Sequence, residues 1–210
     1  MRKYPHNVAF MTYEIFAALI AFAFVTVITP GPNNLMLMAS GANFGFRRTV
    51  PHMLGIGLGM PAMVFLVGVG IMQVFDRWPV SYTVLKIASV AYLLYLAWKI
   101  ANAAPVARTQ AKGKPLTFLQ SAAFQWVNPK AWTMALSAIT LYATGRDLMS
   151  ILWVAGTYIA VSTVSTTSWT TLGQQMRRVL NNPTRMRIFN RAMAILLVAT
   201  LIPVLWPVQT

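Results

Sequence analysis

The sequence predicts an all-α integral membrane protein in which six hydrophobic segments form two inverted three-helix repeats. Of the 210 residues, 57% are hydrophobic and only 10% are charged, a composition typical of a polytopic membrane protein. The apolar runs have lengths near the roughly 20 residues that cross a bilayer as a helix. The first and the fourth are broken at proline, and interrupted segments at matching places in two halves indicate a transporter.

The six segments follow one another in a regular order. The first covers residues 15–40 and is broken in its middle, and the second covers residues 53–75 and contains five glycines. The third covers about residues 82–98 and is closed by Lys99. The fourth covers residues 118–143 and is broken at Asn128-Pro129-Lys130. The fifth, residues 151–172, is rich in serine and threonine, and the sixth covers about residues 192–208.

This order predicts a single transmembrane domain over residues 1–210 that is built from two repeats. The first repeat covers about residues 13–101, a loop covers about residues 102–115, and the second repeat covers about residues 116–208. Each repeat has a broken segment, then a segment rich in small residues, then an uninterrupted one. Because three spans per repeat is an odd number, the second repeat enters the membrane from the opposite side.

Basic residues are unevenly distributed among the predicted loops. Eleven lysines and arginines lie in the loops after the first, third and fifth segments, and four lie on the opposite side. Positive residues favour the cytoplasmic side, so we expect both termini on the outside and the 102–115 loop in the cytoplasm. Two of the four, Arg2 and Lys3, are lost if translation starts at Met11 instead of Met1.

Composition also excludes several classes of function. The formal net charge of +14 is interpreted as an orientation signal and as contact with anionic lipid heads, and no nucleic acid is expected as a partner. The chain has no cysteine, and it shows no carboxylate pair, metal-ligand cluster or phosphate-binding loop. We therefore expect neither an enzyme nor a cofactor. His6 and His52 are expected at loop positions.

The two breaks share one pattern, in which a good N-cap residue precedes a proline at the first helical position. Each break starts a half-helix whose positive end points into the protein, which suits the carboxylate of an amino acid. The freed backbone carbonyls of Thr26, Ile28 and Gln125 are expected to accept hydrogen bonds from its ammonium group. The predicted substrate-binding residues are Thr29, Pro30, Gly31, Pro32, Asn33, Asn34, Gln125, Asn128, Pro129 and Lys130.

Three alternatives stay open at this point. The prolines can be simple kinks in membrane helices. Lys130 either meets the substrate or extends its side chain to the membrane interface. The hydroxyls between residues 162 and 171 either line a polar path or bond to helix backbones. The Gly55-x-x-x-Gly59 pattern is expected to serve helix packing.

Several motifs of the chain resemble the LysE/RhtB family of amino-acid exporters. They are Thr29-Pro30-Gly31-Pro32-Asn33-Asn34, Gly45-Phe46-Arg47-Arg48, Gly55-Ile56-Gly57-Leu58-Gly59, Ala91-Tyr92-Leu93-Leu94-Tyr95-Leu96-Ala97-Trp98-Lys99 and Phe124-Gln125-Trp126-Val127-Asn128-Pro129-Lys130. The resemblance covers nearly the whole chain from Met11.

The resemblance implies an inner-membrane secondary transporter that exports small neutral amino acids or their derivatives and is driven by the proton gradient. Such substrates are of the cysteine/O-acetylserine or threonine/homoserine type. The tract around Phe124 and Trp169 is most similar to the branch that exports cysteine and O-acetylserine. Many members carry an aspartate just after the second-segment glycines, where this chain has Met60, so a proton-carrying acid is missing at that position.

The expected partners are a small amino-acid substrate and the lipid bilayer, and a homodimer is left open. A non-transporting membrane scaffold or assembly protein is the alternative interpretation. A scaffold has no need of paired discontinuous helices with amide side chains at their breaks, so the sequence favours the exporter.

Overall fold

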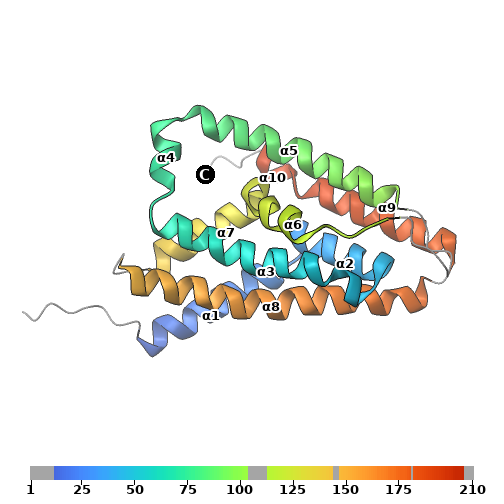
Figure 1. Ribbon diagram of the computed structural model, residues 1–210, viewed down its shortest axis with the longest axis horizontal. Helices are drawn as coiled ribbons and strands as arrows, with labels where there is room; N and C mark the ends of the chain where they lie inside the picture. The colour runs from blue at the N-terminus through green and yellow to red at the C-terminus, as the bar shows by residue number, and fades with distance from the viewer. Residues whose placement is uncertain (1–11, 104–112, 144–146, 181, 206–210) are drawn as a thin grey trace, which may run out of the picture.

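The computed structural model describes residues 12–103, 113–143, 147–180 and 182–205, which form helices and connecting segments with no sheet among them (Figure 1). Residues 1–11 lie outside the described part, so the alternative start at Met11 stays a prediction. In chain order the elements are α1 (Tyr13–Ile28), α2 (Pro32–Phe44), α3 (Phe46–Gly68), α4 (Met72–Arg77), α5 (Val80–Ala101), α6 (Phe118–Phe124), the short 3-10 helix η1 (Gln125–Val127), α7 (Pro129–Tyr142), α8 (Leu148–Val179), α9 (Pro183–Ala199) and α10 (Ile202–Leu205).

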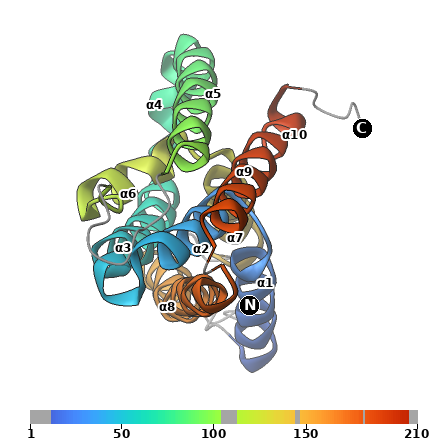
Figure 2. The same ribbon diagram turned by 90° about the vertical axis from the view of Figure 1, so that its right-hand side faces the viewer.

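Most helices follow the long axis of the molecule and alternate in direction. In Figure 1, α1 with α2, α5 and α8 run from left to right, whereas α3, α6 with α7, and α9 run back. Helix α8 contacts α1, α2 and α3, helix α3 contacts α6 and α7, and α5 pairs with α9. Figure 2 shows α4 and α5 on one side of the molecule and α1 and α8 on the opposite side.

Three helices in the described ranges, α3, α5 and α8, are long and apolar enough to cross a membrane. Helices α1 and α2 form a fourth candidate if the pair is one span, and they meet at a bend of 56°. Trp78 just before α5 and Trp98 in its last turn are 63% and 65% exposed. Such aromatic side chains favour the two membrane interfaces, so their positions fit a spanning α5.

The other two predicted segments are less continuous in the structure. The fourth is divided into α6, η1 and α7, as the proline break predicts. The sixth begins at Pro183 rather than near residue 192, because Asn182 caps α9 and Pro183 occupies its first position. The count of six spans and their division into two repeats stay predictions.

Helix α3 begins earlier than the sequence predicts. Its first residue is Phe46, not Met53, because Gly45 adopts φ +82° and turns the chain directly after α2. This left-handed conformation carries little cost at glycine. As a result His52, expected in a loop, lies within α3 and is buried with an exposed fraction of 1%.

Glycines bring the helices close together at two crossings. A Cβ atom at Gly41 would clash with the Thr170 carbonyl of α8, and one at Gly173 would clash with the Met38 carbonyl of α2. At Gly59 it would lie 2.8 Å from Ala122 Cα of α6, well inside normal contact. Gly55 likewise faces the backbone of α6, so the predicted packing role of the Gly55-x-x-x-Gly59 pattern is confirmed.

Two large apolar clusters and a small third one form the core. The first joins α1, α3, α7 and α8 through Leu19, Met63, Val64, Ala135 and Val154. The second joins α2, α5, α6 and α9 through side chains that include Leu35, Leu93, Phe124, Met193 and Leu197. Each broken segment therefore contributes one helix to each large cluster.

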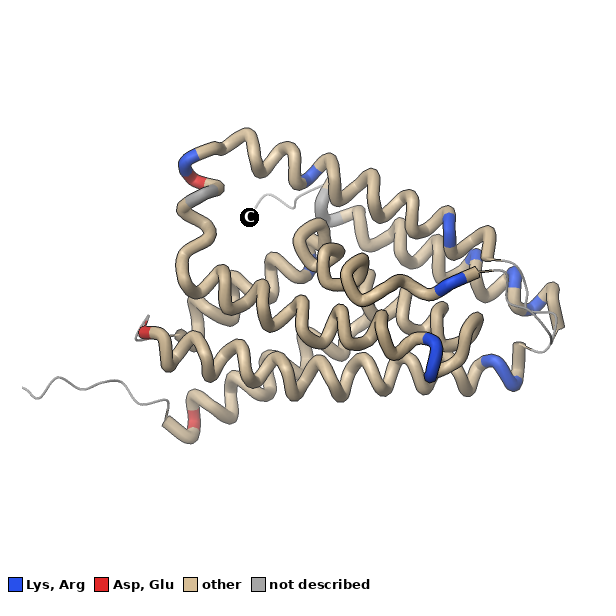
Figure 3. The backbone as a smooth tube through the Cα atoms, in the orientation of Figure 1, with Lys and Arg blue, Asp and Glu red and all other residues tan. Residues whose placement is uncertain are grey.

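Charges are separated along the long axis (Figure 3). The three acids of the chain are Glu14 in the first turn of α1, Asp76 in α4 and Asp147 at the start of α8. Figure 3 shows acidic positions at the left and most lysines and arginines toward the right. The two ends of the molecule thus differ in charge, as the count of lysines and arginines in the loops predicts. Their orientation in the membrane stays a prediction.

Candidate functional site

The first break separates α1 from α2 at residues 29–31. The backbone leaves the helix at Thr29, with φ −62° and ψ 147°, and Pro32 is the first residue of α2. The prediction that Thr29 caps the second half-helix with Pro30 at its first position is therefore wrong, because Thr29 ends α1 and Gly31, without a side-chain cap, precedes α2. Thr29 and Pro30 are exposed, whereas Gly31, Pro32 and Asn34 are buried. The break therefore runs from the surface of the protein into its interior.

Side chains satisfy the carbonyls at the end of α1. Val27 O accepts hydrogen bonds from Asn34 Nδ2 at 2.7 Å and Ser165 Oγ at 3.2 Å. Ile28 O accepts one from Trp169 Nε1 at 3.0 Å, and the Thr29 hydroxyl donates to Thr26 O at 3.0 Å. Buried carbonyls need such donors.

These contacts revise one expectation. The carbonyls of Thr26 and Ile28 are occupied by protein donors, and Gln125 O accepts from Asn128 N at 3.2 Å. Each of the three therefore already accepts a hydrogen bond from the protein in this conformation. The carbonyl of Thr29, at the exposed part of the break, accepts from Asn34 Nδ2 and from Lys130 Nζ, each at 2.8 Å.

The second break lies at Asn128, between η1 and α7. Asn128 has φ −96° and ψ 107°, and its side-chain oxygen accepts from Lys130 N at 3.2 Å. Pro129 follows at the first helical position. The predicted N-cap at this break is therefore confirmed, and the helix starts where the sequence predicts.

The two breaks are in direct contact. Asn33 Nδ2 donates to Gln125 Oε1 at 2.9 Å, and Gln125 Nε2 donates back to Asn33 Oδ1 at 3.2 Å. Lys130 Nζ donates to Thr29 O at 2.8 Å and Thr29 Oγ1 at 2.9 Å, with Pro30 O at 3.4 Å. A Cβ atom at Gly31 would lie 2.7 Å from Lys130 Cδ, so a larger residue there would displace the lysine side chain from its present position.

The Lys130 side chain lies between two helix ends whose dipoles have opposite sign. Lys130 is the second residue of α7, where the helix dipole is positive and disfavours a cation. The C-terminal end of α1, which presents the Thr29 carbonyl, is negative. No acid of the described residues bonds to Lys130, so the end of α1 holds its ammonium group.

A small cavity of about 20 Å³ lies between the two breaks. This is room for about one water molecule. The lining residues come from both breaks, from α3 and from α8, and they are Val27, Gly31, Asn33, Asn34, Ile56, Met60, Asn128, Lys130, Met134, Ser162, Ser165 and Thr166.

Two features of the cavity wall suit an anion. Helix α2 has no side-chain cap at its N-terminus. The backbone N–H groups of its first turn, at Asn33 and Asn34, therefore remain available as hydrogen-bond donors. The Ser162 hydroxyl is buried, and no residue in the described part of the chain forms a hydrogen bond with it. Together with the Lys130 ammonium, these groups can donate to a carboxylate.

Comparison with known proteins decides the family. A family model described as the LysE type translocator matches residues 24–201, from within α1 to the segment after α9. The chain belongs to this family. The cysteine/O-acetylserine efflux proteins of Escherichia coli (strain K12) and Shigella sonnei (strain Ss046) are each 30% identical to it over 194 residues, which is 90% of this chain and 96% of theirs. No solved structure matches.

Family membership confirms the resemblance drawn from the motifs. The chain is a multi-pass membrane translocator of the LysE type and not an enzyme. The aspartate expected from many members is Met60 here, and Met60 is buried in the cavity wall with an exposed fraction of 1%.

The structure brings together the residues predicted for the translocator's site. Gly31, Asn33, Asn34, Asn128 and Lys130 line the cavity. The other predicted residues support it by contact or by starting a helix, namely Thr29 and Pro30 at the Lys130 ammonium, Gln125 at Asn33, and Pro32 and Pro129 at the first positions of α2 and α7.

Helix α8 supplies the part of the site that the sequence leaves unresolved. Ser162, Ser165 and Thr166 face the cavity, whereas Thr163 is exposed and bonds to its own backbone at Ile159 O. Two of the cavity-facing hydroxyls also bond to helix backbones, Ser165 to Val27 O and Thr166 to Thr163 O. Facing the cavity and bonding to a backbone are therefore not exclusive roles in this tract.

Proposed function

We propose that this translocator exports small neutral amino acids or derivatives, such as cysteine and O-acetylserine, across the bacterial inner membrane. Its relatives named as cysteine/O-acetylserine efflux proteins support the substrate class. The observation that carries the proposal is the contact between Lys130 Nζ and Thr29 O at 2.8 Å. It joins a cation on one broken segment to a carbonyl dipole on the other.

An amino-acid zwitterion matches both halves of this contact. Its carboxylate can accept from Lys130 and from the uncapped first turn of α2, and its ammonium group can donate to Thr29 O. The substrate would thus insert between the two groups and replace one contact with two complementary ones. Charge-assisted hydrogen bonds of this kind are stronger than neutral ones.

Binding of a whole amino acid requires the two breaks to separate. The cavity of about 20 Å³ is too small for more than a water molecule, so this conformation is closed. We infer that transport alternates between closed and open arrangements of the two broken segments. The helix pairing supports an inverted repeat, since each broken segment packs against the small-residue helix of the other half, α1 and α2 on α8, and α6 and α7 on α3.

The proton gradient is the proposed driving force. Among the residues that line the cavity, Lys130 is the one titratable side chain, because Met60 stands where an acid is common in the family. Proton coupling through this cavity would therefore use the Lys130 amine. Exchange of substrate for substrate needs no net proton movement, so the coupled and uncoupled reactions can be measured separately.

Counterflow into proteoliposomes tests the proposal. Vesicles that contain the purified protein are preloaded with unlabelled cysteine, O-acetylserine, threonine or homoserine, and uptake of the labelled compound is followed. We expect exchange of at least one of these compounds above the rate in protein-free vesicles. Rates equal to those of protein-free vesicles for the whole panel would contradict amino-acid export and favour a scaffold.

A further inference from the structure

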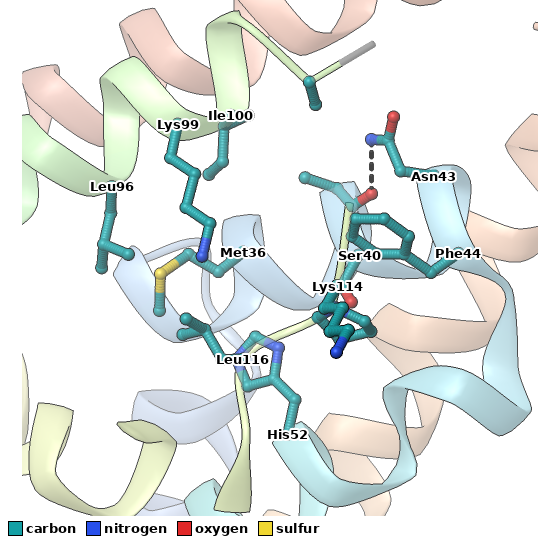
Figure 4. A pocket seen from close by; sticks show the side chains of 13 residues that line it. Met36, Ser40, Asn43, Phe44, His52, Leu96, Lys99, Ile100, Lys114 and Leu116 are labelled. Carbon is teal, nitrogen blue, oxygen red and sulfur yellow. Dashed lines mark hydrogen bonds between the residues drawn. The ribbon is translucent and has the colours of Figure 1, made fainter. Parts of the chain in front are cut away.

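A second pocket lies near the basic end of the molecule, apart from the two breaks. Its volume is about 70 Å³, and it is bounded by α2, α3, the end of α5 and the segment that precedes α6. Figure 4 shows His52 pointing into it from α3, and Lys99 reaching down from α5 into the same space. Lys114 and Leu116 complete the wall on the side of the preceding segment.

His52 is the unusual member of this pocket. It is 1% exposed, and neither of its ring nitrogens has a hydrogen-bond partner among the described residues. A neutral imidazole offers one donor and one acceptor, and leaving a buried donor unpaired is costly. The other polar groups of the wall are already paired, because Ser40 bonds to Thr49 at 2.9 Å and Asn43 bonds to Asn190 at 2.8 Å.

The positive charge around His52 has no acidic partner in the chain. Lys99 and Lys114 line the pocket. Arg48 lies close by, since it donates to the Gly113 carbonyl at 3.0 Å. The three acids of the whole chain sit in the first turn of α1, in α4 and before α8, at the opposite end of the molecule (Figure 3).

We propose that this pocket binds one compact anionic group, a carboxylate or a phosphate. Lys99 and Lys114 supply the charge, and the His52 ring N–H supplies a buried donor. The apolar remainder of the wall, which includes Met36, Leu96 and Leu116, lowers the local dielectric and strengthens these interactions.

The position of the pocket favours the carboxylate of the transported amino acid. His52, Ile56 and Met60 are spaced four residues apart and share one face of α3. Ile56 and Met60 line the cavity between the breaks, so His52 lies on the same face, about 6 Å along the helix from Ile56 and about 12 Å from Met60. The pocket would collect substrate at the basic end before it reaches the breaks. Identifying the bound anion as the transported amino acid rests on the proposed function, whereas the anion site itself does not.

The test uses the fact that the chain has only two histidines. In a His6→Gln background, isotope-labelled histidine gives the ring signals of His52 alone in nuclear magnetic resonance spectra of the full chain in neutral detergent. The probes are acetate, O-acetylserine and short-chain phosphatidylglycerol, with phosphatidylcholine as the uncharged comparison. The variants are Lys99→Gln and, as a matched control, Lys86→Gln, which removes an exposed lysine from the same helix.

We expect acetate to shift the His52 signals saturably, and Lys99→Gln to require about tenfold more acetate, the loss expected for one charged contact. Lys86→Gln should behave as the parent. A shift with O-acetylserine but not with phosphatidylglycerol identifies the substrate as the source, and the reverse identifies a lipid phosphate. If acetate shifts the signals while counterflow fails, the anion site stands and the proposed function falls. Unchanged signals with all three anions, or equal responses in Lys99→Gln and the parent, would overturn the proposal.

Discussion

Lys130 Nζ lies 2.8 Å from the carbonyl oxygen of Thr29, although 101 positions separate the two residues in the chain. The contact joins the positive start of α7 to the negative end of α1. Gly31 leaves space for it, because a Cβ atom there would press on the Lys130 side chain. A lysine interpreted from the sequence either as a substrate ligand or as an interfacial side chain thus holds the two breaks together.

The first prediction concerns Asn34, whose amide supports the end of α1. Its Nδ2 donates to Val27 O at 2.7 Å and to Thr29 O at 2.8 Å. Asn34→Ala leaves a buried carbonyl short of a donor, so we expect a loss of about 1–3 kcal/mol in unfolding free energy. Transport should fall further than stability does, because Thr29 O loses its fixed position.

Thermal unfolding in detergent and counterflow measure the two effects. Asn102→Ala is the matched control, since Asn102 makes a similar bond to Trp98 O at 2.8 Å at an exposed site. Parent-like transport and stability in Asn34→Ala would contradict the role given to this amide.

The second prediction compares two glycines of α8. Gly173→Ala places a methyl group against the Met38 backbone. Neither the new methyl group nor the Met38 carbonyl can move freely, because both are fixed to helix backbones. We expect a destabilisation of about 1–3 kcal/mol, as for other overpacked sites. Gly156→Ala has nothing within 4 Å of the new methyl group and should be neutral, or more stable by up to about 1 kcal/mol. Thermal unfolding midpoints of the two variants test this prediction. Equal midpoints would refute the close contact between α2 and α8 at Gly173.

The third prediction places a reporter in the cavity. The chain has no cysteine, so Ser162→Cys introduces a single thiol where the buried, unpartnered hydroxyl lies. We expect slow alkylation in everted vesicles, because the cavity is closed, and slower alkylation still when O-acetylserine is saturating. Thr184→Cys, at the exposed start of α9, is the control and should react at one rate throughout. Substrate-independent labelling of Ser162→Cys would place the substrate elsewhere.

The fourth prediction is the orientation of the protein. With eleven of the loop lysines and arginines on one side and four on the other, we expect a periplasmic C-terminus and a cytoplasmic Lys112. Alkaline phosphatase fused to the C-terminus should be active, and the same enzyme fused after Lys112 should be inactive. An inactive C-terminal fusion at normal expression would reverse the topology or make the number of spans odd.

Much of the site could be predicted because its signals are local. Asn128 is a good cap and Pro129 starts α7 directly after it, as predicted, whereas α2 starts at Pro32 after the uncapped Gly31 and not at Pro30 after Thr29. The partners of these residues could not be predicted in the same way. The Trp169 bond to Ile28 O spans 141 positions, and no spacing rule connects residues so far apart.

His52 shows a second limit of the sequence. The polar run around Arg47 and Arg48 suggests a loop, yet a single left-handed glycine at Gly45 closes the turn and extends α3 over the whole run. Burial of His52 then follows from the packing of α3 on its neighbours. Boundaries of this kind depend on one backbone conformation, which the residue type permits but does not require.

The most direct test of the account is counterflow by Lys130→Gln with two substrates, O-acetylserine and the corresponding amine that lacks the carboxylate. Rates are normalised to folded protein in the membrane, and Lys86→Gln serves as the control. If the ammonium group of Lys130 meets the substrate carboxylate, exchange of the amino acid should fall in kcat/KM by about tenfold to a hundredfold, while the amine is affected less. Equal exchange of the amino acid by Lys130→Gln and the parent protein would contradict the account.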